Sequence, residues 1–346
     1  MKKELLMGTA LVSTLGAASV AEAVTATMSG NHQTGIEFDS PTNGTDTNAQ
    51  INDNNFTVSL SETTDGGMTI SSSFKIMDEN TKEDYDAGFT LAFTDGSKLD
   101  VIAAGNAAGS HAVSIPGSAG AEGVTVTSTN SAPTGLDFMT GSTALGIEYH
   151  TAADFLTDGL KLSVSASTDN GAANTATYRT DSHMAIAATY VTDLGDTAVT
   201  LGAGYTTTDG SRDGTAINND PAGMHVGVSA VTGDLTVAVG FADGDDTSGD
   251  KDGNEYTGDV VKGGVKYVTG DLTFNVGLTQ GTSKDGALGT AGTTEDSKDV
   301  TSASVSYAVA SGVTAILGYT TVDSTDEGDS DTTDGSAWYI GANMAF

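Results

Sequence analysis

Trp338-Tyr339-Ile340-Gly341-Ala342-Asn343-Met344-Ala345-Phe346 is the stretch that decides the fold of this chain. Every second residue is apolar, and the residues between them are smaller or more polar. Because successive side chains of a strand point to opposite faces, this alternation predicts a strand with one apolar face. The apolar face ends on the aromatic side chain of Phe346. A strand of this kind is typical of a barrel whose outer surface meets lipid.

The beginning of the chain predicts export. Lys2 and Lys3 precede an apolar run from Leu5 to Val20, and Ala21-Glu22-Ala23 fits a small-x-small cleavage site. We therefore expect residues 1–23 to be a signal peptide and residues 24–346 to form one outer-membrane β-barrel domain. A closed barrel pairs all of its backbone groups within the sheet, so it crosses a membrane without a transmembrane helix.

The composition narrows the classes of function. The chain has 346 residues with 45 Gly, 4 Pro and no Cys, which favours many strands and tight turns and excludes disulfides and thiolate metal sites. The formal net charge is −33 at pH 7. Nucleic acid is not expected as a partner, because phosphate binding requires a basic surface.

Alternation recurs in segments of about ten residues, and the connections between them alternate in length. Short turns rich in Gly and Asp are expected near 64–66, 95–97, 151–158, 193–196, 232–234, 269–271 and 310–312. Long polar stretches lie at 39–54, 78–84, 104–142, 169–181, 207–222, 243–259, 281–299 and 323–335. These connections predict an all-β, sixteen-stranded antiparallel transmembrane barrel, with short turns on the periplasmic side and long loops outside.

This layout resembles the general diffusion porins of Gram-negative outer membranes, over the whole chain after the leader. The resemblance implies a passive, water-filled channel for small hydrophilic solutes and ions, a homotrimer, no cofactor and no enzymatic activity. It also implies that the third loop, 104–142, folds into the lumen and narrows it. By the same resemblance Phe346 serves as an assembly signal. The third loop departs from the commonest family pattern, since Glu122 and Asp137 are its only charges.

The phase of each strand predicts which charges line the lumen, because they are out of step with the apolar face. We expect these to set the ion preference at the constriction together with the two acids of the third loop. The basic set is Lys75, Lys98, Lys161, Arg179, Lys262 and Lys266, and the acidic set is Glu37, Asp86, Asp100 and Glu148. For any one of these charges, solvation in a wide lumen is the simpler interpretation.

Most acidic residues fall in the long loops, which predicts an acidic outer mouth and a cation-preferring channel. Solvation of the loops explains this acidity, and weak capture of divalent cations is the functional alternative. The densest set is Asp243, Asp245, Asp246, Asp250, Asp252 and Glu255. Structural Ca²⁺ bound there could bridge the loops to anionic lipopolysaccharide in the outer membrane.

Catalytic motifs are hard to find. His32, His111, His150, His183 and His225 stand at no ligand spacing, and no G-x-S-x-G elbow is present. Two other interpretations share part of the pattern. A non-pore adhesin or structural barrel would act through its acidic loops, and a secreted acidic Ca²⁺-binding repeat protein would require a fixed repeat that we do not find.

Overall fold

The computed structural model of the chain describes residues 24–42, 44–78, 81–82, 88–101, 106–117, 146–168, 178–212, 222–246, 254–287, 294–325 and 334–346. Side chains at 78, 81–82, 168, 178–181, 208–212, 246, 254–256, 285–287 and 294 are not among those described. The expected signal peptide, residues 1–23, lies outside these ranges.

Almost every described residue belongs to a strand. The strands are β1 (Thr25–Pro41), β2 (Thr47–Thr63), β3 (Thr69–Asp78), β4 (Thr81–Lys82), β5 (Phe89–Ala92), β6 (Lys98–Val101), β7 (Gly146–His150), β8 (Leu160–Thr168), β9 (Tyr178–Leu194), β10 (Thr197–Arg212), β11 (Ala222–Thr232), β12 (Leu235–Asp246), β13 (Asn254–Thr269), β14 (Leu272–Ala287), β15 (Thr294–Ala310), β16 (Val313–Thr325) and β17 (Gly335–Ala345). One short helix, α1 (Ala107–Ser110), stands among the described residues.

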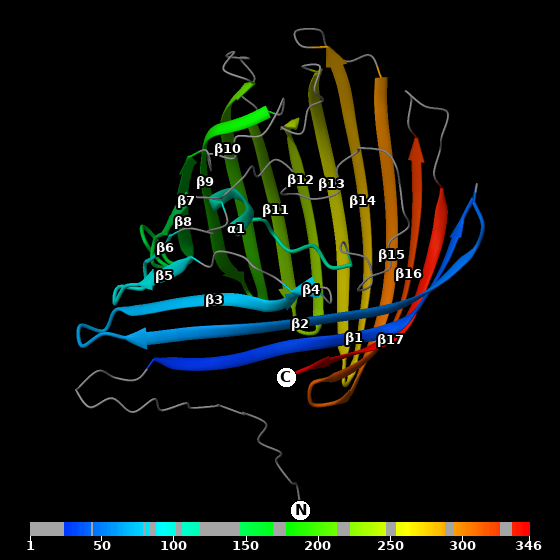
Figure 1. Cartoon of the computed structure of the whole chain (residues 1–346), viewed down its shortest axis with the longest axis horizontal. Helices are drawn as coiled ribbons and strands as arrows, with labels where there is room; N and C mark the ends of the chain where they lie inside the picture. Colours follow the sequence, from blue (N-terminus) through cyan, green and yellow to red (C-terminus); the bar gives the residue numbers. More distant parts are fainter. Residues whose placement is uncertain are drawn as a thin grey trace, which may run out of the picture.

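The strands form one closed antiparallel sheet. Apart from β4, each strand pairs with the next one along the chain, and β1 pairs with both β2 and β17, which closes the ring (Figure 1). The two-residue β4 pairs only with the end of β3 and does not enter the wall. Sixteen strands therefore make the barrel, as the sequence predicted. At the closure, the Tyr339 ring is fully buried and its hydroxyl donates to the Thr34 carbonyl at 3.3 Å.

The seven short turns lie where the sequence placed them. Each contains a glycine with positive φ, at Gly67, Gly96, Gly159, Gly195, Gly233, Gly270 and Gly312. At Gly270, which links β13 to β14, φ is +59°, a left-handed conformation that glycine adopts without a steric cost. Because hairpins alternate ends in an antiparallel barrel, these seven turns share one rim.

Most connections at the other rim are shorter than expected, because the strands continue into them; the second, between β3 and β5, and the third, between β6 and β7, are the exceptions. β1 and β2 occupy most of 39–54, and β12 and β13 enter 243–259 from both sides. Strands of 16 or 17 residues, such as β13 and β1, exceed the roughly 9–11 residues needed to cross a bilayer. Backbone pairing does not depend on side-chain polarity, so the strands can extend beyond the apolar band. Both faces of a strand are polar there, and the alternation of apolar and polar residues no longer predicts the strand.

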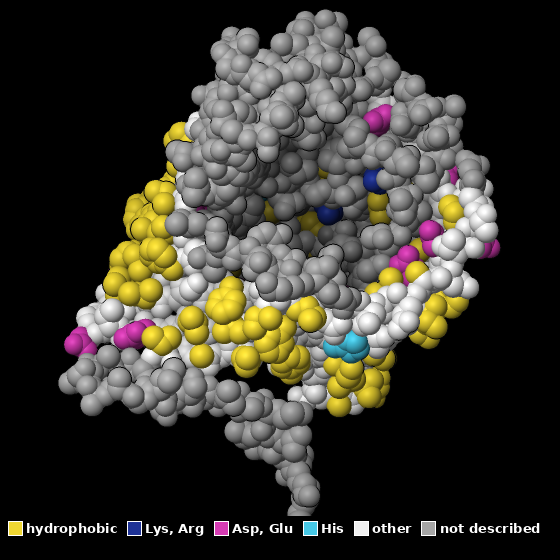
Figure 2. Space-filling view, in the orientation of Figure 1, with side chains coloured by type: hydrophobic (Ala, Val, Ile, Leu, Met, Phe, Trp, Pro, Cys, Tyr) yellow, Lys and Arg dark blue, Asp and Glu magenta, His cyan; other side chains and the backbone are white. Residues whose placement is uncertain are grey.

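The large apolar side chains point outward, whereas a soluble protein would bury them. Ile186 and Ile340 are both 55 % exposed, and hydrophobic side chains gather on the outer surface of the wall (Figure 2). An exposed apolar belt of this kind is the surface that lipid covers. Among the described residues, no helix is long and apolar enough to span a membrane.

Candidate functional site

The inner face of the barrel is the candidate site, and strand pairing defines it continuously around the ring. Directly paired residues share a face, so one phase can be followed from strand to strand. For example, Lys262 pairs with Gly240 and Thr279, and Lys266 pairs with Thr236 and Asn275, all on the face opposite the exposed Val261 and Val265. Basic side chains are visible inside the hollow of the barrel (Figure 2).

The structure places eight of the predicted lumen charges on this inner face. Lys98 and Asp100 pair with His150 and Glu148, and Lys161 pairs with Thr189. Glu37 pairs with the buried Tyr339, and Lys75 pairs with Thr57. The eight residues are Lys75, Lys98, Lys161, Lys262, Lys266, Glu37, Asp100 and Glu148.

The remaining predicted residues lie at the limits of the described structure. Arg179 pairs with Ser211 beyond a register shift, and its side chain is outside the described set. Asp86, Glu122, Asp137, Asp250 and Asp252 fall outside the described residues altogether. Asp243 pairs with Asp259 and Asp245 with Thr257, while Asp246 and Glu255 are described only as strand backbone. The interpretation of the acids as a Ca²⁺ site therefore stays a prediction.

Residues 106–117 of the third connection lie against the inner face, and we call them the inward segment (Figure 1). Asn106 caps α1 by accepting a hydrogen bond from the Gly109 N–H at 2.8 Å. The Ala107 N–H donates to Ser165 of β8 at 3.0 Å, and His225 of β11 is 2.7 Å from the Ala108 carbonyl oxygen. At the far end, Ser302 of β15 donates to the Gly117 carbonyl. The inward segment therefore follows the wall from β8 to β15.

Apolar contacts hold the middle of the inward segment. Val113 and Ile115 are buried against Ala238, Ala242 and Val260, which face inward from β12 and β13. Ala107 and Ala108 pack on Ala185 and Ala187 of β9. These contacts explain why a lumen wall, usually polar, carries small apolar residues at these places.

Glycines on the inner wall make room for the inward segment. A Cβ atom at Gly204 would overlap His225 and Ala108, and one at Gly264 would overlap the Pro116 carbonyl. Gly227 stands against Val113, where an added Cβ would come within 2.8 Å of the Val113 Cβ. Glycine inside a strand often marks a close approach of another backbone, and that is its role here.

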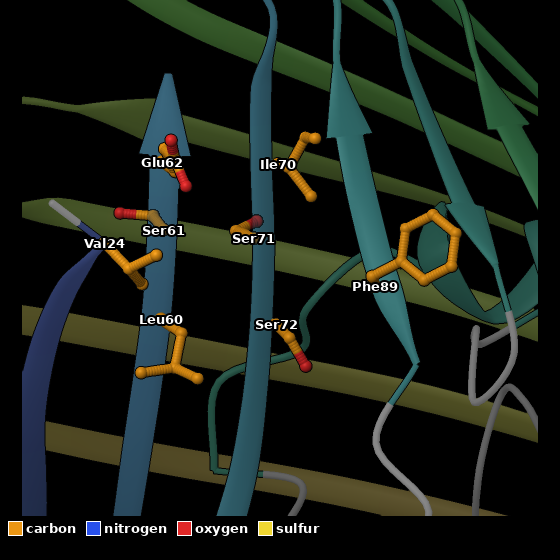
Figure 3. Close-up of a pocket in the computed structure, with 8 residues that line it drawn as sticks. All are labelled: Val24, Leu60, Ser61, Glu62, Ile70, Ser71, Ser72 and Phe89. Carbon is orange, nitrogen blue, oxygen red and sulfur yellow. The ribbon is translucent and has the colours of Figure 1, made fainter. Parts of the chain in front are cut away.

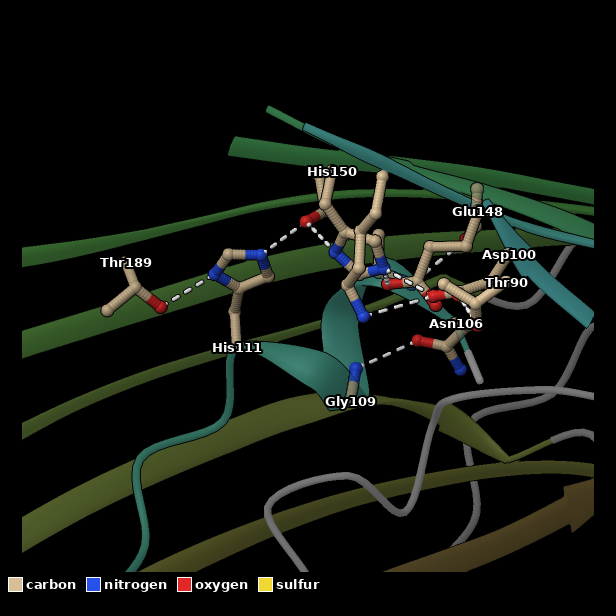
Figure 4. A network of polar contacts seen from close by, with 12 residues as sticks. Thr90, Asp100, Asn106, Gly109, His111, Glu148, His150 and Thr189 are labelled. Carbon is tan, nitrogen blue, oxygen red and sulfur yellow. Dashed lines mark hydrogen bonds and ion pairs between the residues drawn. The ribbon is translucent and has the colours of Figure 1, made fainter. Parts of the chain in front are cut away.

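A buried polar network joins the inward segment to the wall (Figure 4). The His111 ring is hydrogen-bonded to Thr189 through Nδ1 and to Ser163 through Nε2, both at 2.6 Å. Ser163 is also 2.7 Å from His150 Nδ1, and His150 Nε2 is 2.9 Å from Asp100 Oδ2. Burial lowers the pKa of His111 to about 4, and the neighbouring Lys161 acts in the same direction. His111 is therefore neutral at pH 7, with one nitrogen donating and the other accepting.

The order Asp100, His150, Ser163 has the connectivity of a hydrolase triad, but the environment of the serine does not support catalysis. Ser163 is 1 % exposed and its hydroxyl is held between two imidazoles. A nucleophile needs a free face for its substrate. We read this chain of contacts as structural.

Two features of the candidate site were not predicted from the sequence. The histidines looked scattered, but pairing across β7, β8 and the inward segment brings His111 and His150 to one serine. The inward glycines were visible only as part of a high glycine content. Their positions within strands, in phase with the lumen charges, were the signal that could have identified a segment lying against the wall.

A separate pocket lies where β3 pairs with β5 over only three residues, Thr69–Ser71 (Figure 3). Its lining is mainly apolar, and the single charged residue in it is Glu62. The lining residues are Val24, Leu60, Ser61, Glu62, Ile70, Ser71, Ser72 and Phe89. The pocket contains none of the predicted lumen charges.

Comparison with protein families gives one match over most of the chain. Residues 8–326 match the family described as Gram-negative porin. A comparison with curated proteins finds no match.

Solved structures give further matches at low sequence identity. An in-vitro folded OmpT from Vibrio cholerae, an outer membrane protein in a trimer form, is 15 % identical with a TM-score of 0.62 over 94 % of this chain and 100 % of its own. An anion-selective porin from Comamonas acidovorans is 11 % identical with a TM-score of 0.63 over the same shares. A mutant porin of Rh. blastica is 16 % identical with a TM-score of 0.57 over 93 % of this chain and 100 % of its own. At these identities the likeness concerns the fold.

Proposed function

The chain belongs to the Gram-negative porin family, and from that membership we propose that it is a passive, water-filled channel for small hydrophilic solutes and ions. It is an outer-membrane protein, and both its family and its fold point to a channel rather than an enzyme. Passive diffusion requires neither a cofactor nor an energy source.

The observation that carries the proposal is the inward segment on a charged wall. A closed barrel alone would also suit an adhesin or a structural protein. Here a stretch of the third connection is seated inside the ring, on a face that carries Lys161, Lys262 and Lys266. A backbone that enters the lumen reduces the cross-section of the lumen. Solutes then pass close to the wall, so they are selected by their size and by the charges that line the pore. Glu122 and Asp137 would add acidic groups to the same connection.

The preference for cations is argued from this chain's own charges. The porin from Comamonas acidovorans is anion-selective, but an identity of 11 % carries no selectivity over to this chain. The net charge of −33 favours cations at the mouth, and the wall lysines oppose it. We propose that the mouth dominates at low salt.

Assembly and lipid contacts complete the proposal. We propose a homotrimer, which the trimer form of the Vibrio cholerae protein supports by analogy. Weak Ca²⁺ binding at the acidic outer connections would link them to lipopolysaccharide, since clustered carboxylates suit hard divalent cations. Size measurement of the detergent-solubilised barrel tests the trimer, and Ca²⁺ titration with lipopolysaccharide tests the link.

Recording from planar bilayers tests the channel itself. Purified, folded barrel should produce stepwise conductance increases that scale with the salt concentration, and liposomes containing it should swell in small sugars but not in large ones. Heat-denatured protein in the same detergent is the control. Folded barrel that inserts without conductance steps would favour the adhesin or structural alternative.

A further inference from the structure

Two neighbouring strands bring three metal-ligating side chains together on the inner wall (Figure 4). Asp100 of β6 pairs directly with Glu148 of β7, and His150 lies two residues along β7. One donor atom from each residue can be chosen so that all three lie within 4.8 Å of one another. His150 Nε2 is 2.9 Å from Asp100 Oδ2 and 3.4 Å from Glu148 Oε1.

These separations match the edges of a metal coordination shell. Zn²⁺ bonds of about 2.0–2.2 Å to nitrogen and oxygen place adjacent donors about 3.4 Å apart in tetrahedral geometry and about 3.0 Å apart in octahedral geometry. The two edges that meet at His150 Nε2 already have these lengths. The third edge, between one oxygen of each carboxylate, is at most 4.8 Å long.

The orientation of each donor is fixed from behind. Ser163 is 2.7 Å from His150 Nδ1, so a proton on Nδ1 donated to Ser163 leaves the Nε2 lone pair facing the two carboxylates. Thr90 donates to the other oxygen of Asp100, Oδ1, which keeps Oδ2 turned toward His150. Outer hydrogen bonds that set the imidazole tautomer and orient a carboxylate are typical of metal sites in proteins.

Burial and charge leave this cluster short of hydrogen-bond donors and of positive charge. Glu148 is 1 % exposed and His150 is 3 % exposed, and Glu148 Oε1 accepts no hydrogen bond from the described residues. The two carboxylates face the imidazole of His150, which carries no charge when it is neutral. The nearby ammonium group is that of Lys98, which is partly exposed and lies 3.2 Å from Asp100 Oδ2. A buried carboxylate oxygen without a donor is costly, and a metal ion removes that cost. The partial exposure of Asp100 leaves a path from the lumen.

We propose that Asp100, Glu148 and His150 bind one divalent transition-metal ion of the Zn²⁺ class. The imidazole donor and the small number of protein ligands disfavour Ca²⁺, which takes six to eight oxygens, and Mg²⁺, which keeps several waters. This site lies on the barrel wall, apart from the acidic outer connections, and its existence does not depend on whether the barrel conducts.

An ion pair with a protonated His150 is the competing explanation of the same contacts. In that case the imidazolium proton on Nε2 is shared by the two carboxylates and no metal is needed. Lys98 distinguishes the two cases, because its ammonium group competes with a metal for Asp100 Oδ2. If the cluster is a metal site, removing Lys98 should strengthen metal binding. If it is an ion pair with protonated His150, the cluster should have no metal affinity with or without Lys98.

Calorimetric titration of the detergent-solubilised, folded full chain with Zn²⁺ tests the proposal, with excess Mg²⁺ present to saturate the outer acids. The wild type should bind one Zn²⁺ per chain at this site. Glu148→Gln and His150→Gln should weaken that binding by at least about tenfold, and Lys98→Met should tighten it. His32→Gln, which removes a histidine outside the cluster, should change nothing. Heat-modifiable mobility on gels confirms that each variant is folded.

Two results would overturn the metal site. One is folded wild-type protein with no saturable Zn²⁺ binding, which assigns the cluster to an imidazolium ion pair. The other is Zn²⁺ binding whose affinity is the same in the wild type, Glu148→Gln and Lys98→Met, which assigns the ion to carboxylates elsewhere. Should His150→Gln fail to fold, the Lys98→Met comparison still decides, because it removes no proposed ligand.

Discussion

Individual glycines on the inner wall decide how closely the third connection can approach the strands. Gly264 of β13 meets the backbone of Pro116, whereas its neighbour Gly263 points to the opposite face. A Cβ atom at Gly263 would find only Val239 Cγ1, at 3.9 Å. The two positions are adjacent in the same strand, so they form a matched pair for testing the contact between the inward segment and the inner wall.

We expect Gly264→Val to displace the inward segment and raise single-channel conductance. Forcing added methyl groups into a packed contact costs typically about 1–3 kcal/mol, so the thermal unfolding midpoint of this variant should also fall. Gly263→Val adds the same volume on the outer face and should leave both quantities close to wild type. Equal conductance in the two variants would show that the inward segment does not narrow the pore.

At the residue scale, strand phase assigned eight charges to the face on which strand pairing puts them, while their role at the constriction stays a prediction. It did so because the face of a side chain depends only on local alternation. It could not foresee that Ser163 joins His111 to His150. That contact needs β7, β8 and the third connection to meet, and the pairing of distant segments leaves no local trace in the sequence.

At the element scale, the turns were more predictable than the strand ends. Turn geometry demands particular residues, so Gly195 and Gly233 mark their hairpins directly. The outer ends of β12 and β13 were missed because pairing continues among polar residues such as Asp243 and Thr257. α1 was not expected either. Its single turn depends on the Asn106 cap and on packing against β9, and short helices are rarely stable by themselves.

The last strand, β17, gives a prediction about closure of the barrel. Just beyond it, the Phe346 N–H donates to the Gly30 carbonyl at 3.0 Å, and the Gly30 N–H donates to the Phe346 carbonyl at 3.2 Å. The Phe346 ring lies 5.8 Å from that of Phe56, centroid to centroid. Deleting Phe346 removes the backbone pair and the ring, so we expect a clear loss of folded barrel in the membrane fraction.

Phe346→Ala separates the two contributions, since it keeps the backbone pair with Gly30 and removes only the ring. Heat-modifiable mobility of membrane fractions measures the folded share at matched expression. We expect an intermediate loss for Phe346→Ala if the aromatic ring also serves as an assembly signal. Assembly of the deletion variant at the wild-type level would contradict the importance of this end of β17.

At the scale of the whole molecule, two sets of charge oppose each other along the path of an ion. The chain carries a net charge of −33, and its densest acidic runs belong to the outer connections. The inner wall carries Lys75, Lys98, Lys161, Lys262 and Lys266. Lys98 is paired with Asp100, which reduces its field in the lumen, while Lys262 and Lys266 lie on one strand of the wall.

We expect cation preference at ~0.1 M KCl that shrinks as salt rises. The Debye length falls from about 10 Å at 0.1 M to about 3 Å at 1 M, so charges at the mouth are screened before those that an ion touches inside. Reversal potentials across a KCl gradient measure this. Replacing Lys262 and Lys266 with Gln should increase cation preference most at 1 M, where the wall dominates, and the single change Lys284→Gln near the rim of β14 should matter only at low salt. An anion preference of the wild type at ~0.1 M would mean that the wall lysines outweigh the acidic mouth.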